Sequence, residues 1–221
     1  MSKFQTPAPV TVVLDIPAGR VEVIAADRSD TVVEVRPADP SKGKDAKAAE
    51  QIAVEYTDGV VRITAPEPKD KLFGSSGSVE VTVQAPTGSH LEAVSAAAEF
   101  RGVGRLGEVS VRGGHRTVKF DETAGARITA HDGTVEVGRL GGSAEIGVQR
   151  GDITVAEAQA GSLTLTAQQG DITVAAAPGV SASLDASTTL GRVHNTLKND
   201  GAPALEIHAT TQQGDISARS L

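Results

Sequence analysis

The heptapeptide Gln149-Arg150-Gly151-Asp152-Ile153-Thr154-Val155 returns as Gln168-Gln169-Gly170-Asp171-Ile172-Thr173-Val174, and its beginning closes the chain as Gln212-Gln213-Gly214-Asp215-Ile216-Ser217. Each copy is a glycine turn that leads into a strand in which aliphatic residues alternate with polar ones. The first two copies start 19 residues apart, at positions 149 and 168. Repeats of this length without a helix between them are typical of a coil that grows by stacking one turn on the next. We therefore expect an all-β fold, a β-solenoid similar to a parallel β-helix.

Shorter glycine-to-strand phrases fill the rest of the C-terminal half. Most of them begin nine or ten residues apart, so that two phrases make one turn of about 19 residues. A single turn cannot cover its own apolar side, and its neighbours in the stack must do so. Residues 91–221 are predicted to form this solenoid. The turn positions of the repeats are expected to be structural: Gly133, Gly142, Gly151, Asp152, Gly161, Gly170, Asp171, Gly214 and Asp215.

Residues 1–90 also alternate like strands, but with a different rhythm. Turn clusters such as Pro17-Ala18-Gly19 and Thr57-Asp58-Gly59 separate the expected strands. Residues 45–51 favour a short helix, and residues 69–77 are expected to form a mobile loop. We interpret residues 1–90 as a β-rich N-terminal cap, or as irregular first turns, of one continuous unit, because the end of a stack needs cover against edge-to-edge pairing. The expected strands are residues 10–16, 20–25, 31–35, 52–56, 60–63 and 78–84.

Composition limits the classes of function. With 39% apolar but only 2% aromatic residues and no Trp, the core must consist of Val, Ile, Leu and Ala in many small, equivalent layers. The absence of Cys excludes disulfides, thiolate metal sites and cysteine nucleophiles. A formal net charge of −7 without a basic stripe argues against nucleic acid and anionic membranes as partners. No export signal follows Met1, and no stretch reaches the roughly 20 apolar residues of a membrane helix, so we expect a cytoplasmic protein.

The repeats also resemble those of a known family. The opening Ala18-Gly19-Arg20-Val21-Glu22-Val23, the Gly-Asp-Ile repeats, the late Gly191-Arg192-Val193-His194-Asn195-Thr196-Leu197 and the terminal Gly214-Asp215-Ile216 are similar to the DUF4097 β-strand-repeat proteins. These proteins are common in actinobacteria and are labelled "putative adhesin". The resemblance covers nearly the whole chain, and it implies a β-strand-repeat fold whose motifs carry no catalytic residues.

Two short motifs have both a functional and a structural interpretation. Gly102-Val103-Gly104-Arg105-Leu106-Gly107 has the glycine spacing of a dinucleotide-binding loop, which requires a helix after the glycines to hold the pyrophosphate. The strand-like Glu108-Val109-Ser110-Val111 follows instead. Arg150-Gly151-Asp152 spells an adhesion tripeptide, but it occupies an ordinary repeat position, where the other copies carry Gln169 or Gln213 in place of the arginine. We expect both motifs to be structural.

The carboxylates and histidines of the repeats also have both a functional and a structural interpretation. Asp152, Asp171 and Asp215 could align at one corner and gather a cation, but calcium-binding β-rolls supply several oxygens per turn and this repeat supplies one, so we favour a turn-capping role. Carboxylates such as those of Glu136, Glu145 and Glu157 are expected to face solvent, although stacking could align an acid with a base about 4.8 Å away. We predict no catalytic residue, cofactor or metal site. No two histidines have the spacing of a metal pair: His90, His115, His131, His194 and His208.

Three functions are compatible with this pattern. A non-catalytic protein-binding or scaffold module is favoured, because a regular polar surface is present without a chemical motif. A self-assembling cytoplasmic β-helix polymer, like the bactofilins, is the first alternative, and it is motivated by the closing strand at residues 214–218, which has no obvious capping helix. A carbohydrate-active β-helix enzyme is the second. It is disfavoured because one Tyr, four Phe and no Trp make a sugar-stacking platform hard to build.

Overall fold

The computed structural model describes residues 1–66, 77–113 and 116–221, whose strands form one continuous 17-stranded sheet. The expected mobile loop lies outside the described residues except for Gly77, and so does His115. In the described part of the chain, no helix combines the length and apolar character that crossing a membrane requires. The elements are, in chain order, β1 (Ser2–Gln5), β2 (Thr11–Ala26), β3 (Asp30–Pro37), α1 (Gly43–Gln51), β4 (Ala53–Thr57), β5 (Val60–Thr64), β6 (Val79–Pro86), β7 (His90–Gly113), β8 (Val118–Asp132), β9 (Val135–Leu140), β10 (Ala144–Arg150), β11 (Ile153–Ala158), β12 (Gly161–Gln169), β13 (Ile172–Ala176), β14 (Ala182–Leu190), β15 (Val193–Thr196), β16 (Leu205–Gln213) and β17 (Ile216–Ser220).

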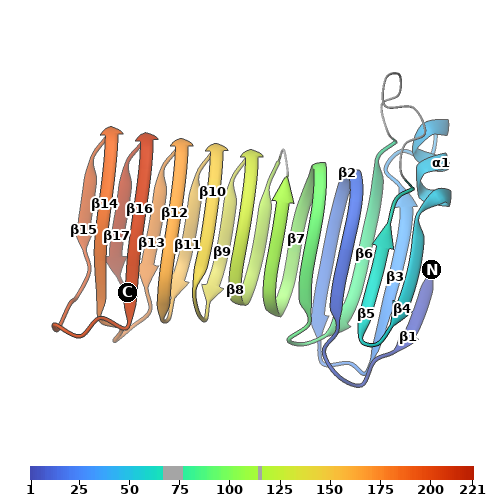
Figure 1. Cartoon of the computed structure of the whole chain (residues 1–221), viewed down its shortest axis with the longest axis horizontal. Helices are drawn as coiled ribbons and strands as arrows, with labels where there is room; N and C mark the ends of the chain where they lie inside the picture. The colour runs from blue at the N-terminus through green and yellow to red at the C-terminus, as the bar shows by residue number, and fades with distance from the viewer. Residues whose placement is uncertain (67–76, 114–115) are drawn as a thin grey trace.

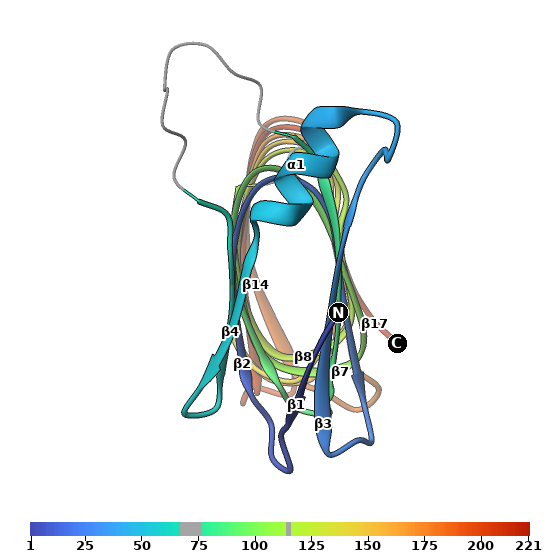
Figure 2. The same cartoon turned by 90° about the vertical axis from the view of Figure 1, so that its right-hand side faces the viewer.

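The sheet winds into a flattened coil with two broad faces, which Figure 1 shows from the side and Figure 2 from one end. The long strands β2, β7 and β8 bend at corners and so contribute to both faces. We call face A the surface made by β4, β5, β10, β12, β14 and β16 with residues 11–16, 90–95, 108–112 and 125–132. Face B is made by β1, β3, β6, β9, β11, β13, β15 and β17 with residues 19–26, 98–103 and 118–123. The predicted all-β solenoid is confirmed.

Neighbouring turns are joined by parallel ladders in which equivalent residues lie opposite each other. Ile153 pairs with Val135 on one side and with Ile172 on the other, which are offsets of 18 and 19 residues. On the opposite face Ile146 pairs in the same way, and its neighbour Leu165 is 19 residues away. Parallel pairing in this register lines up side chains of the same kind, so each inward row becomes an apolar column that runs along the stack.

These columns form one continuous core from Val10 to Ile216. The aliphatic side chains that fill it are at most 7% exposed, and many, such as Ile128 and Leu163, are at most 1% exposed. Burial of each such side chain contributes about 1.5–3 kcal/mol. Phe100 and Phe120 are the largest fully buried side chains, and they lie on neighbouring strands of face B near the middle of the stack. A narrow interior between two sheets explains why small aliphatic residues suffice.

The N-terminal end of the stack is closed by antiparallel strands. β3 runs antiparallel to β6, β1 runs antiparallel to β3, and β4 runs antiparallel to β5. The rings of Phe4 on β1 and Tyr56 on β4 meet across the interior with their centroids 5.4 Å apart. The helix α1 lies across this end (Figure 2), where Ala48 packs against the core and the buried Asp45 accepts a hydrogen bond from the Ser78 N–H. This end is therefore covered by side chains and by a helix.

At the other end the turns do not stack in sequence order. β12 pairs with β16 rather than with β14, and β16 then pairs with β14, while β13, β17 and β15 follow the same order. Figure 1 shows β14 and β15 outermost. The expectation that residues 214–218 form an open closing strand is wrong, because β17 lies inside the stack. The inner turn contributes Leu205, Ile207 and Ala218 to the core, whereas the outer turn carries the polar Asn195 at the inward position opposite Ala218, where exposure to water costs less.

Candidate functional site

The Gly-Asp corners of the repeat form a hydrogen-bonded ladder where face A turns into face B. Asp152 Oδ1 accepts a 2.8 Å bond from the main-chain N–H of Asp171, and Asp171 Oδ1 accepts a 2.7 Å bond from the N–H of Asp215. Asp215 Oδ1 in turn accepts a 2.8 Å bond from the N–H of Arg192. Each aspartate thus caps the adjacent turn of the stack and not its own turn. The ladder ends at Arg192, which offers no carboxylate to a further turn.

The glycine before each aspartate has a steric role, which Gly170 illustrates. Its φ is 145°, a conformation that is essentially restricted to glycine, and a Cβ there would lie 2.0 Å from the Gly151 carbonyl oxygen. The stacked corners approach too closely for any side chain. Among the predicted turn glycines, Gly142 differs, because its φ is not positive. The other members of the set have positive φ: Gly133, Gly151, Gly161, Gly170 and Gly214.

The Arg150-Gly151-Asp152 tripeptide is engaged within the stack. Arg150 Nε lies 2.6 Å from the Asp132 carboxylate on the neighbouring turn. Asp152 is occupied by the main chain of Asp171. Both charged groups of the tripeptide thus make contacts between turns, as expected for an ordinary position of the repeat.

The G-x-G-x-x-G spelling lies wholly within strand β7, and no helix follows it. A Cβ on Gly102 would lie 2.3 Å from the Phe120 ring, so this glycine makes room for the largest core side chain. Gly104 has a φ of 80°, and a Cβ there would lie 2.2 Å from the Ala25 carbonyl oxygen. These glycines serve packing, and the helix N-terminus that a pyrophosphate site requires is not at this position.

The histidines of the described residues lie on separate strands. His90 Nδ1 accepts a 2.9 Å bond from the Glu108 N–H, and His208 Nδ1 lies 3.6 Å from the Asp185 carboxylate. His131 ends the face A part of β8, and His194 is exposed on β15. In the ranges 1–66, 77–113 and 116–221, no three His, Cys, Asp or Glu side chains gather as metal ligands.

A groove crosses the outer surface of face A. It is open along its length, has a volume of ≈ 520 Å³ and runs across β2, β7, β8, β10 and β12. Because side chains alternate between core and solvent on each strand, every strand contributes outward groups to the same trough. Its charged and polar lining includes Thr11, His90, Glu92, Glu108, Arg127, Glu145 and Thr164.

The groove carries more negative than positive charge. Glu92, Glu108 and Glu145 line it together with one cation, Arg127. Arg127 Nε lies 3.2 Å from the Glu145 carboxylate, and both side chains are well exposed. An exposed pair of this kind contributes under about 1 kcal/mol, so a ligand can replace either member at little cost. The surface suits a ligand with basic groups.

The other carboxylates singled out in the sequence lie on face B and are matched with cations. Glu136 pairs with Lys119, and Glu157 lies 3.2 Å from Arg139 Nε. Arg139 also lies 3.9 Å from the Glu122 carboxylate. Stacking therefore aligns Glu136 and Glu157 with basic side chains, which fits a structural role on the solvent side of the sheet.

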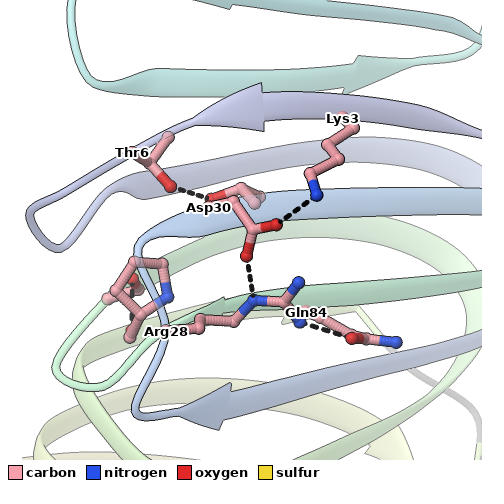
Figure 3. Close-up of polar contacts among 8 residues, drawn as sticks. Lys3, Thr6, Arg28, Asp30 and Gln84 are labelled. Atoms are coloured by element: carbon pink, nitrogen blue, oxygen red, sulfur yellow. Dashed lines mark hydrogen bonds and ion pairs between the residues drawn. The ribbon is translucent and has the colours of Figure 1, made fainter.

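A polar cluster near the N-terminus fastens the end strands together (Figure 3). Asp30 Oδ1 accepts a 2.7 Å bond from Arg28 Nε, Asp30 Oδ2 lies 2.9 Å from Lys3 Nζ, and Arg28 also donates to Gln84. The hydrogen bonds from Arg28 and Lys3 lower the pKa of Asp30 from 3.8 to about 2. The contacts join β1, β3 and β6, so we assign the cluster to stability.

Sequence reasoning did not find the groove. Its lining comes from positions as distant as Thr11 and Thr164, which only the stack brings together. Alternation indicated that Glu145 faces solvent, but it does not say which of two faces a strand joins. To find the groove from the sequence, one would need to know the order in which the turns stack on each face.

Comparison with known proteins places the chain in context. A family model described as Toastrack DUF4097 matches residues 8–219. No curated protein matches the chain.

Several solved structures are similar to it. One, described as a "putative cell adhesion protein" from Clostridium sporogenes, has 10% identity and a TM-score of 0.44, with 100% of this chain and 98% of that chain covered. A "putative adhesin" from Bacteroides fragilis has 12% identity and a TM-score of 0.46, with 98% and 95% covered. A "putative adhesin" from Parabacteroides merdae has 10% identity and a TM-score of 0.42, with 100% and 95% covered. Because these TM-scores are all low, the similarity to these structures does not indicate what the chain does.

Proposed function

The chain belongs to the Toastrack DUF4097 family and is a β-repeat module, and from that premise we propose that it is a non-catalytic protein-binding or scaffold module that receives its partner on face A. The observation that carries the proposal is the ≈ 520 Å³ groove across five strands of that face. Parallel ladders hold these strands in register, so the groove is a rigid surface. Binding to a preformed surface avoids the entropic cost of ordering it.

The charge of the groove favours a partner segment with Lys or Arg residues. Glu92 and Glu108 come from neighbouring levels of the stack, and Glu145 comes from two levels further on, beyond the level of Arg127. Adjacent levels are about 4.8 Å apart. An extended segment laid across the strands can bring basic side chains to several of these carboxylates. Complementary charges of this kind mainly raise the association rate and the specificity of a complex.

The contacts within the groove support binding rather than catalysis. His90 Nδ1 is taken by the Glu108 main chain, and Glu145 is paired with Arg127 in the absence of a partner. Within the described residues, the groove lining contains no Phe or Tyr, so the stacking platform that carbohydrate-active sites use is missing here. The cytoplasmic location and the exclusion of nucleic acid stay predictions of the sequence.

Native co-purification with charge-reversal variants tests the proposal. The double variant Glu92→Lys/Glu145→Lys should lose at least ten-fold of the partner that the wild-type chain recovers. The matched control Glu34→Lys/Glu80→Lys makes the same charge change on face B and should recover the partner as the wild type does. Equal melting temperatures of the two double variants establish that both are folded.

Two results would contradict the proposal. If both double variants recover the same partner in equal amounts, the groove is not the docking surface. If the wild-type chain and the groove variant recover the same background proteins at every salt concentration, the chain has no partner on this face.

A further inference from the structure

The two ends of the stack are built differently. At the N-terminal end the edge strands β1 and β4 have 4 and 5 residues, and the ring pair of Phe4 and Tyr56 seals the interior. At the C-terminal end the edge strand β14 has 9 residues, Ala-Ser-Leu-Asp-Ala-Ser-Thr-Thr-Leu, with no Lys, Pro or Gly and with Asp185 as its one charge. Proteins usually protect edge strands by shortness, lysine or proline, and β14 has none of these protections.

The main chain of this C-terminal edge has unused pairing capacity. In the described part of the chain β14 pairs with β16 and β15 with β17, each on one side only. Ser181 accepts a 3.2 Å bond from the Leu205 N–H of β16, whereas the next residue, Ala182, donates away from β16 to the Lys198 carbonyl. Because main-chain groups alternate in direction along a strand, the inward-facing residues of β14 point their N–H and C=O groups off the end of the stack. These residues are Leu184, Ala186 and Thr188.

The side chains of the same turn are incompletely covered. Leu184 and Ala186 are only half-buried, although the residues that they pair with on β16 are fully buried. Val193, which pairs with the buried Ile216, is 46% exposed. Another layer placed on this end would bury these apolar groups and satisfy the main chain at the same time.

We propose that this end binds a second copy of the chain, tail to tail, through antiparallel pairing of β14 with β14 and of β15 with β15. The flattened cross-section allows this arrangement, because a two-fold axis normal to both faces continues each sheet into the partner's sheet on the same side (Figure 2). Such an interface is isologous and closes at two copies.

The sequence of β14 is compatible with pairing about its centre. With Ala186 on the axis, Leu184 lies opposite the partner's Thr188, and Asp185 lies opposite the partner's Ser187. Residues with outward-directed main-chain groups then meet each other, as a hydrogen-bonded antiparallel pair requires. Apolar side chains stay on the core side in both copies, and the two aspartates avoid each other.

The charge of this end also permits self-association. Residues 181–204 contain two acidic and two basic residues, Asp185, Asp200, Arg192 and Lys198, so their net charge is zero while the chain carries −7. The negative charge of the chain is therefore not concentrated at this end, and two copies can meet there without strong electrostatic repulsion. The short antiparallel edge strands and the ring pair at the other end oppose head-to-tail growth, so the expected product is a dimer and not a filament.

Sedimentation equilibrium of the full chain tests the dimer. At tens of micromolar the wild-type mass should be twice the 22.5 kDa of one chain. Ala186→Pro removes an N–H that points off the stack, and proline is tolerated at such edge positions, so this variant should melt close to the wild-type temperature and sediment as a monomer. Ala186→Lys should also give a monomer, because an inward-facing lysine blocks edge pairing.

The control variant is Ser187→Lys. It adds the same charge on the neighbouring residue, whose side chain faces solvent and whose main chain faces β16, and it should remain a dimer. A wild-type chain that is a monomer at 100 µM would overturn the proposal. So would a dimer that survives both Ala186 variants, or a mass that keeps growing with concentration, since growth would require the N-terminal end to take part.

Discussion

Replacement of Gly170 by alanine should destabilise the protein by roughly 2–6 kcal/mol. A φ of 145° places this residue in a region that alanine adopts only at a cost of about 1–3 kcal/mol. The added Cβ would also lie 2.0 Å from the Gly151 carbonyl oxygen, and relief of such overpacking costs about 1–3 kcal/mol more. The two terms add because the turn cannot change its φ without breaking the ladder on either side.

Urea unfolding followed by circular dichroism measures this cost. The control is Gly147→Ala, because Gly147 lies in strand β10 without positive φ and a Cβ there meets no atom within 4 Å. This control should change the free energy of unfolding by no more than about 0.5 kcal/mol. A lower midpoint with an unchanged slope assigns the effect of Gly170→Ala to stability.

Equal stability of the two alanine variants would refute the steric argument. It would show that the corners have room for a side chain and that the corners at Gly151 and Gly170 do not approach each other as closely as described. A reduced slope for Gly170→Ala alone would instead indicate that the turns unfold separately, as repeat proteins do when an interface between repeats is weakened.

Three further outcomes are expected. Asp171→Ala should lower the free energy of unfolding by about 0.5–1.5 kcal/mol, because the Asp215 N–H loses its acceptor, while Asp171→Asn, which keeps that oxygen, should unfold at the wild-type urea midpoint. The depressed pKa of Asp30 makes its contribution to stability present above pH 3.8 and lost as pH falls through about 2. The advantage of the wild type over Asp30→Asn in urea midpoint should therefore shrink steadily from pH 5 to pH 2, and an advantage that is constant over this range would contradict the pairing. Phe120→Ala should cost about 3–5 kcal/mol in the same urea assay, because the ring is 1% exposed, whereas Val94→Ala, at a site that is 42% exposed, should cost far less.

Much of the fold could be predicted because its determinants are local. The helix expected at residues 45–51 is α1 (Gly43–Gln51), and the strands expected at residues 78–84 and 60–63 are β6 (Val79–Pro86) and β5 (Val60–Thr64). The two strands expected at residues 10–16 and 20–25 are one bent strand, β2, since the chain turns the corner at Pro17-Ala18-Gly19 without leaving the sheet. Alternation shows where a strand runs, but it does not show whether its hydrogen bonds continue around a bend.

The candidate surfaces depended on distant contacts. The groove on face A needs β2, β7, β8, β10 and β12 to follow one another across the face, and the open end exists only because β14 and β15 are outermost. The sequence of the repeats does contain one indication that the turn of β14 and β15 is outermost. The corner position that holds Asp152, Asp171 and Asp215 holds Arg192 in the remaining turn, and a turn without the carboxylate cannot cap a further neighbour.

Period-two alternation and the glycine corners were enough, by themselves, to determine that this chain makes short strands that stack, since both act within one turn. The order of the last two turns was decided by tertiary structure. Turn 205–220 brings Leu205, Ile207 and Ile216 and is placed between two neighbours that bury them, while turn 182–196, with the polar Asn195 facing inward, is placed at the end. The free energy of burial depends on what covers a side chain, and a repeat of equivalent turns does not specify which neighbour that is.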